Sequence, residues 1–170
     1  IFLYATPNDD GLQISHDSSG NIDLRFAGGA SVGTPFTLPL NTWSHLVITR
    51  DSSGYIRQFL NGVLKNYNQK TDAIDRDFVT IGNRNGGNHF LGYISNVRWV
   101  KDSIPTSYQT SETSTGTTVF TSTTAPLTTS SQGATSADVK LLTCQSNRFI
   151  DTSDNQTFTF NGTPKVSTNT

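Results

Sequence analysis

The chain has 170 residues, no methionine, 15% charged residues and a net charge of −1. A domain that binds nucleic acid normally carries a basic patch or a high pI, so the near-neutral charge argues against that partner. No run of about 18 apolar residues occurs, so we expect no segment that spans a membrane.

The composition favours β-structure. Glycine, threonine, serine and asparagine are abundant, whereas leucine, alanine and glutamate are scarce, and Glu112 is the only glutamate. Good helix formers are therefore rare, and β-branched and turn residues dominate. We expect one all-β domain over residues 1–170. Because the sequence begins at Ile1, we expect it to be a segment of a longer polypeptide or a processed product.

Short candidate strands separated by turn residues follow one another along the chain, which is typical of a sandwich or barrel. Asn61-Gly62 is the strongest turn signal, because both positions of a type I′ turn require a positive φ. In the longest candidate strand, apolar residues fall on opposite faces before and after Ser95-Asn96, which predicts a β-bulge there. The predicted strands are 11–17, 22–27, 36–40, 42–50, 55–60, 63–69, 77–83, 89–101, 138–145 and 156–162.

Three predicted turns share one style of sequence: DSSGN at 17–21, DSSGY at 51–55 and DTSDN at 151–155. Asp and Ser side chains bond to nearby backbone amides, so such turns are stable without a ligand. A calcium loop would need oxygen ligands at alternate positions and a late bidentate glutamate, and these stretches lack that spacing. We therefore interpret all three as structural turns.

The stretch 103–137 differs, because more than half of its residues are serine or threonine. Low complexity suggests a linker. Apolar anchors at 118–120 and 125–127 leave a second interpretation, a long ordered loop draped over the sandwich. Residues 138–170 are too few for another domain, so we expect their strands to close the same sandwich, with Phe158 and Phe160 on its apolar face.

Four ordered pieces of sequence carry a resemblance to a known family: WSHLVITRDSSG (43–54), FLNG (59–62), IG (81–82) and FLGYISNVR (90–98). Over about residues 10–101 the chain resembles the laminin-G-like, concanavalin A-like domains. The resemblance implies an antiparallel two-sheet jelly-roll sandwich. From GYISNVRWVK to its end, the amino-acid sequence is similar to laminin-G-like modules in structural proteins of marine phages. This resemblance implies a virion component such as a tail fibre or another appendage.

This resemblance also implies partners and a location. We expect a non-enzymatic module on the virion surface, part of a homo-oligomer, that contacts other virion proteins and recognises a host-surface glycan. The alternative is a module of virion assembly or decoration without glycan binding, because one fold serves many roles. Neither hypothesis involves a cofactor, a metal, nucleic acid or membrane insertion.

The motifs that suggest catalysis are weak. Ser31 lies in a G-x-S-x-G pattern, but TPFTLPL follows it, whereas a nucleophile elbow needs a helix there. Glycoside hydrolysis needs two carboxylates at a set separation. The chain has one glutamate, and Asp72, Asp75 and Asp77 lie in a predicted loop without strand spacing. The single cysteine, Cys144, lies in an apolar stretch and is interpreted as a small buried hydrophobe.

Two places remain for binding. Trp43 shares a predicted strand face with His45, so we expect it to anchor the core, with sugar stacking as the alternative, and His45 to be half-buried. The loop 82–89 is glycine-rich and polar, and amides and guanidinium groups hydrogen-bond well to sugar hydroxyls. Its candidate ligand-binding residues are Asn83, Arg84, Asn85, Asn88 and His89.

Overall fold

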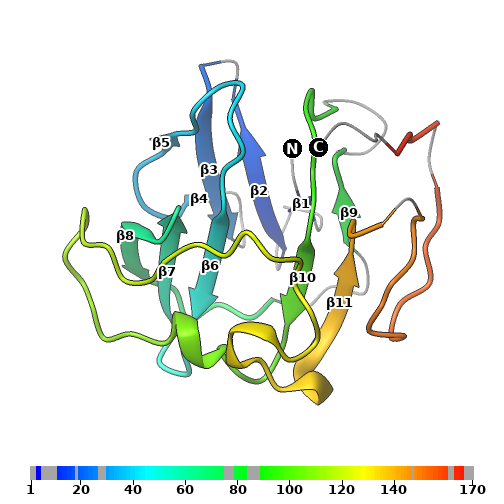
Figure 1. Ribbon diagram of the computed structural model, residues 1–170. Helices are drawn as coiled ribbons and strands as arrows, with labels where there is room; N and C mark the ends of the chain where they lie inside the picture. Colours follow the sequence, from blue (N-terminus) through cyan, green and yellow to red (C-terminus); the bar gives the residue numbers. More distant parts are fainter. Residues whose placement is uncertain are drawn as a thin grey trace. The chain divides into compact units, whose positions relative to one another are not determined.

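The computed structural model describes residues 3–4, 11–17, 19–26, 30–74, 79–83, 89–146, 148–160 and 163–166. The fold is all-β with antiparallel sheets, as predicted, and the helical structure within these ranges is limited to three short 3₁₀ turns (Figure 1). These are η2 (Thr106–Tyr108), η3 (Ser131–Gly133) and η4 (Ser136–Asp138). None of the described helices could cross a membrane.

The chain divides into two compact units. The first unit contains Ile1–Gly92 and Ser111–Ser122, and the second contains Tyr93–Thr110 and Thr123–Thr170. The expectation of one sandwich over residues 1–170 stays a prediction.

One sheet of the first unit has the strand order β4-β3-β2-β1-β9, and β5 also pairs with β3 (Figure 1). Along β3 the side chains of Ile22, Leu24 and Phe26 are buried, and this alternation gives the sheet one apolar face. The strands are β1 (Leu3–Tyr4), β2 (Leu12–His16), β3 (Asn21–Phe26), β4 (Ala30–Ser31), β5 (Phe36–Thr37) and β9 (Thr80–Ile81).

The other sheet of the first unit is a meander of β6 (Leu46–Arg50), β7 (Tyr55–Leu60) and β8 (Val63–Gln69). The predicted Asn61-Gly62 turn is confirmed, because these residues have φ values of 51° and 83°. The two-residue connection fixes the β7–β8 register and therefore the side chains that point inward.

The contacts between the two sheets include the buried amide of Gln58. Gln58 on β7 is 1% exposed, and its Nε2 donates to the Val32 carbonyl at 2.6 Å. The Arg50 guanidinium lies over the Phe26 ring, 5.6 Å from its centroid. A buried polar group requires a partner, so the Gln58 bond helps fix how the sheets align.

The outer face of the meander is covered by residues 111–122. Leu64 donates its N–H to Thr117, Val119 donates to Gly62, and the Phe120 ring packs 5.2 Å from that of Phe59. This part of the Ser/Thr-rich stretch is therefore an ordered loop, held by backbone bonds rather than by apolar periodicity.

The second unit is built on the antiparallel pair β10 (Val97–Val100) and β11 (Val139–Thr143). Leu127, Val139 and Leu142 form its small core, with Val100 packed against them. The predicted strand at 138–145 is thus confirmed, and its role in closing the first sandwich stays a prediction.

Several predicted strands are longer than the observed ones. The strand predicted at 36–40 covers only Phe36–Thr37, and the one predicted at 89–101 covers only Val97–Val100. Asn96 takes a φ of 53°, and its N–H bonds to the Cys144 carbonyl, so the extended backbone is interrupted there. The pairing irregularity itself lies between Trp99 and Val100, so the bulge predicted at Ser95-Asn96 is wrong.

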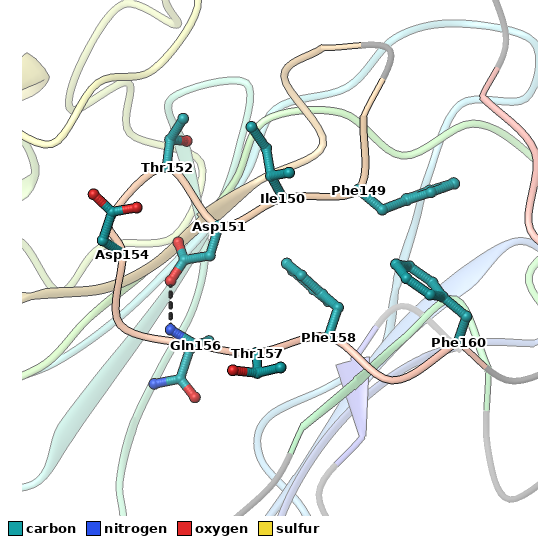
Figure 2. A pocket seen from close by; sticks show the side chains of 9 residues that line it. All are labelled: Phe149, Ile150, Asp151, Thr152, Asp154, Gln156, Thr157, Phe158 and Phe160. Atoms are coloured by element: carbon teal, nitrogen blue, oxygen red, sulfur yellow. Dashed lines mark hydrogen bonds between the residues drawn. The ribbon is translucent and has the colours of Figure 1, made fainter.

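The strand predicted at 156–162 is also wrong for its described part, 156–160, which contains no strand. The Gln156 N–H donates to the Asp151 carboxylate instead of to a neighbouring strand (Figure 2). The Thr/Phe alternation still places Phe158 and Phe160 side by side, and their rings stack with centroids 6.3 Å apart.

Candidate functional site

The predicted binding loop begins at the end of β9. Its base is closed by hydrogen bonds: Phe90 donates its N–H to the Gly82 carbonyl, and Thr80 Oγ1 donates to the Asn83 carbonyl. Asn83 is half-buried and His89 is exposed. The other candidate residues, Arg84, Asn85 and Asn88, lie outside the described residues, so a site in this loop stays a prediction.

Trp43 is exposed rather than buried, which corrects its expected role as a core anchor. The side chain keeps 60% of its surface accessible, whereas Val47 and Thr49 further along are buried. Alternation applies only inside a strand, and β6 begins at Leu46. A turn with Asn41 at φ 55° precedes Trp43, so its indole does not follow the strand pattern.

The backbone next to Trp43 is held by the neighbouring hairpin turn. The His45 N–H donates to the Asn61 side-chain oxygen at 2.8 Å, and the Asn61 N–H donates to the His45 carbonyl. The half-buried His45 ring also meets the Phe120 ring edge-on at 6.1 Å. The exposed indole therefore follows a fixed backbone, which is a condition for selective binding.

Exposed groups of mixed character precede Trp43 in this turn. Leu40 is 72% exposed, and Asn41 and Thr42 are also exposed. An aromatic face packs against the C–H face of a sugar ring, while amides and hydroxyls bond to its hydroxyls. The corner formed by residues 40–43, here called the Trp43 corner, has both kinds of group.

The groups weighed for catalysis have structural positions. Ser31 is exposed at the end of β4 and is not followed by a helix. The Glu112 carboxylate accepts hydrogen bonds from the N–H groups of Ser114 and Thr113. These bonds lower the pKa of Glu112, and the bond from Ser114 has the larger effect. Burial raises the pKa of Cys144, which disfavours a reactive thiolate.

No group of three or more histidine, cysteine, aspartate or glutamate side chains suited to a metal occurs in the described part of the chain. Asp72 is exposed, and Asp75 and Asp77 lie outside that part. The exposed groups of the Trp43 corner offer aromatic stacking and neutral hydrogen bonding.

These features define an antiparallel all-β sandwich protein whose fold can carry a carbohydrate-binding surface. Residues 1–107 match the family model described as the Concanavalin A-like lectin/glucanases superfamily, and the chain belongs to this superfamily. No curated protein and no solved structure matches the chain. The family description covers both lectins and glucanases, so membership admits sugar binding with or without hydrolysis.

Proposed function

We propose that the chain is a non-catalytic carbohydrate-binding module of a virion appendage, and that it contacts host-surface sugar through the Trp43 corner. The observation that carries the proposal is the 60% exposed indole of Trp43 on the part of the chain that matches the superfamily. A large aromatic side chain gains by burial, so a folded domain that leaves one in water is suited to bury it against a ligand.

Four acidic groups in the described part of the first unit support binding without hydrolysis. The carboxylates of Asp17 and Asp51 are bonded to the N–H groups of their own turns. Asp23 pairs with Arg25 at 2.6 Å, and Glu112 caps its own loop. A glycosidase needs one carboxylic acid and one carboxylate facing the same bond, and these groups are engaged separately.

The viral part of the proposal rests on the resemblance of the C-terminal half to phage structural modules. A single shallow corner binds sugar weakly. Many copies on one particle multiply the strength of attachment, because linked sites gain avidity without new contacts. The expected homo-oligomer and the contacts with other virion proteins would supply those copies.

The test is a glycan array probed with the monomeric chain and with a multimerised form, with an assay for sugar release in parallel. We expect the multimer to bind, Trp43→Ala to abolish that binding, and no sugar to be released. Leu40→Ala is the matched control, because it removes an exposed apolar side chain from the same turn without removing an aromatic face. His89→Ala reports on the loop at 82–89.

Three results would contradict the proposal. Release of sugar would make the chain a hydrolase. Binding lost in His89→Ala but kept in Trp43→Ala would move the site to the predicted loop. Absence of binding by the multimer, under conditions in which whole particles attach, would favour the assembly role.

A further inference from the structure

A segment outside the superfamily match packs beside the residues that hold the Trp43 corner. Residues 111–122 follow the end of the match at residue 107, yet they belong to the first unit. The chain reaches them from the second unit and then returns to it, because Tyr93–Thr110 and Thr123–Thr170 both belong there. This segment, here called the strap, is therefore an addition to the matched part of the chain.

The strap is held on the hairpin turn between β7 and β8 by backbone contacts. Leu64 donates its N–H to the Thr117 carbonyl at 2.9 Å, and Val119 donates its N–H to the Gly62 carbonyl at 2.8 Å. A Cβ on Gly62 would collide with the carbonyl oxygen of Phe120. The strap therefore lies directly against the turn, at a distance that glycine alone permits.

This placement brings Phe120 to the residue two positions after Trp43. The Phe120 ring meets the His45 ring edge-on, with centroids 6.1 Å apart and an angle of 72° between the planes. It also lies 5.2 Å from the ring of Phe59, which is 0% exposed. Edge-to-face contacts favour one relative orientation of two rings, so Phe120 links the orientation of His45 to the core of the sheet.

Asn61 holds the same residue from the turn itself. The His45 N–H donates to Asn61 Oδ1 at 2.8 Å, and the Asn61 N–H donates to the His45 carbonyl at 2.9 Å. The turn requires only a positive φ at this position, which glycine would adopt at lower steric cost. The side-chain oxygen of Asn61 therefore adds something that the turn does not need, an acceptor for the backbone next to Trp43.

We infer that Asn61 and Phe120 are positioning residues of the sugar site. Asn61 holds the backbone of His45 and Phe120 holds its ring, and together they fix the stretch that carries the Trp43 indole. A side chain on a fixed backbone loses less conformational entropy when a ligand covers it. The inference rests on the proposed function for its ligand, a carbohydrate, and adds that the site is incomplete without the strap, because residues 1–107 alone contain Trp43 but not Phe120.

Two pairs of variants separate positioning from folding. Asn61→Gly keeps the positive φ of the turn and removes the acceptor for the His45 N–H, whereas Asn61→Asp keeps both. Phe120→Ala removes the ring that meets His45, whereas Phe120→Tyr keeps that ring. Leu24→Val, at a buried position of β3, is the control for a general loss of stability.

Each variant is made in a Trp99→Phe background, in which Trp43 is the only tryptophan. Time-resolved fluorescence anisotropy measures the independent motion of the indole, and titration of the multimerised form over an array of hexose and N-acetylhexosamine oligosaccharides measures binding. We expect Asn61→Gly and Phe120→Ala to increase the amplitude of fast indole motion. They should also raise the half-saturating concentration about three- to tenfold, the effect of roughly one hydrogen bond. Asn61→Asp, Phe120→Tyr and Leu24→Val should behave as the parent does.

The two readouts keep the possible failures apart. Unchanged anisotropy in both Asn61→Gly and Phe120→Ala would overturn the positioning role and leave the proposed function standing. A more mobile indole with unchanged binding, where Trp43→Ala abolishes binding, would show that the site does not depend on these residues. Equal losses in Leu24→Val would reduce the effect to stability. Absence of binding by every form, the parent included, would overturn the proposed function and the ligand assigned here, while the anisotropy would still show whether Asn61 and Phe120 hold the indole.

Discussion

The carboxylate of Asp151 accepts a hydrogen bond from the backbone N–H of Leu142 at 2.8 Å, which ties a C-terminal turn to β11. Only 8% of Asp151 is exposed, and its two oxygens also accept the N–H groups of Ser153, Asn155 and Gln156. A carboxylate that meets so many donors is stabilised in its ionised form even where burial disfavours the charge. The turn and the strand are therefore held together by one buried anion.

Replacement of this anion should destabilise the protein. Asp151→Asn puts an NH₂ group where one oxygen accepted backbone N–H groups, so two donors face each other. We expect the free energy of unfolding to fall by about 1.5–3 kcal/mol, the range for a hydrogen bond to a charged group. Urea denaturation of the two proteins measures the difference.

Asp17→Asn is the matched control, because Asp17 heads a turn of the same style in an exposed position. Its substitution should change stability less, since water can replace the lost bonds. An equal loss in the two variants would show that the link to Leu142 contributes nothing beyond the local turn.

Acid should weaken the fold through the aspartates that head turns. The hydrogen bond from the Asn21 N–H lowers the pKa of Asp17. Burial is the largest single influence on the pKa of Asp51 and of Asp151 and by itself would raise it, but several hydrogen bonds together, led by those from the Tyr55 and Leu142 N–H groups, lower both pKa values. Folded pKa values below the unfolded value of about 3.9 mean that the unfolded chain binds protons first.

The contribution of Asp17, Asp51 and Asp151 to stability is therefore complete above about pH 4 and is lost as the pH falls through their pKa values in the folded protein. We expect the unfolding free energy of wild type to decrease below about pH 4, and Asp151→Asn to show a shallower decrease. Denaturation curves recorded from pH 6 to pH 2, about the window set by these shifts, measure both slopes. Parallel slopes would mean that Asp151 titrates alike in the folded and unfolded chains.

The turns and the central meander could be predicted because their causes are local. Asp51 bonds to the N–H groups of Ser53 and Tyr55, and Asn61-Gly62 adopts the positive φ values that its type requires. Such contacts depend on residues a few positions apart, so the sequence alone determines them. Strand ends were harder to predict, because β10 begins only after Asn96, whose N–H bonds to the carbonyl of Cys144, far along the chain.

The candidate sites could be predicted only in part. Trp43 was assigned by alternation to the core, but alternation cannot tell where a strand begins, and β6 starts three residues later. The Thr/Phe pattern at 156–160 brought Phe158 and Phe160 together, yet it predicted a strand where the chain bonds to Asp151 instead.

Trp43 should contribute little to folding, in keeping with its exposure. We expect Trp43→Ala to change the free energy of unfolding by no more than about 0.5 kcal/mol, as for most surface substitutions. Ile56→Ala, at a position that is 0% exposed, should cost about 2–5 kcal/mol. In a Trp99→Phe background the remaining indole should emit at long wavelength and be quenched readily by acrylamide. A blue-shifted emission that acrylamide quenches poorly would show that the Trp43 side chain is buried.

The last prediction concerns the packing of residues 111–122 on the hairpin turn. Gly62 and Gly116 both have positive φ values, 83° and 92°, so alanine brings similar backbone strain at either position. A Cβ on Gly62 would collide with the Phe120 carbonyl oxygen, whereas a Cβ on Gly116 would meet nothing within 4 Å. Backbone atoms that are held by hydrogen bonds cannot move aside easily, so Gly62→Ala should cost about 1–3 kcal/mol more than Gly116→Ala. Urea denaturation of the two variants measures this difference, and proteolysis within 111–122 should be faster in Gly62→Ala because the loop is displaced. Equal stabilities and equal proteolysis rates would mean that residues 111–122 do not rest on the turn in solution.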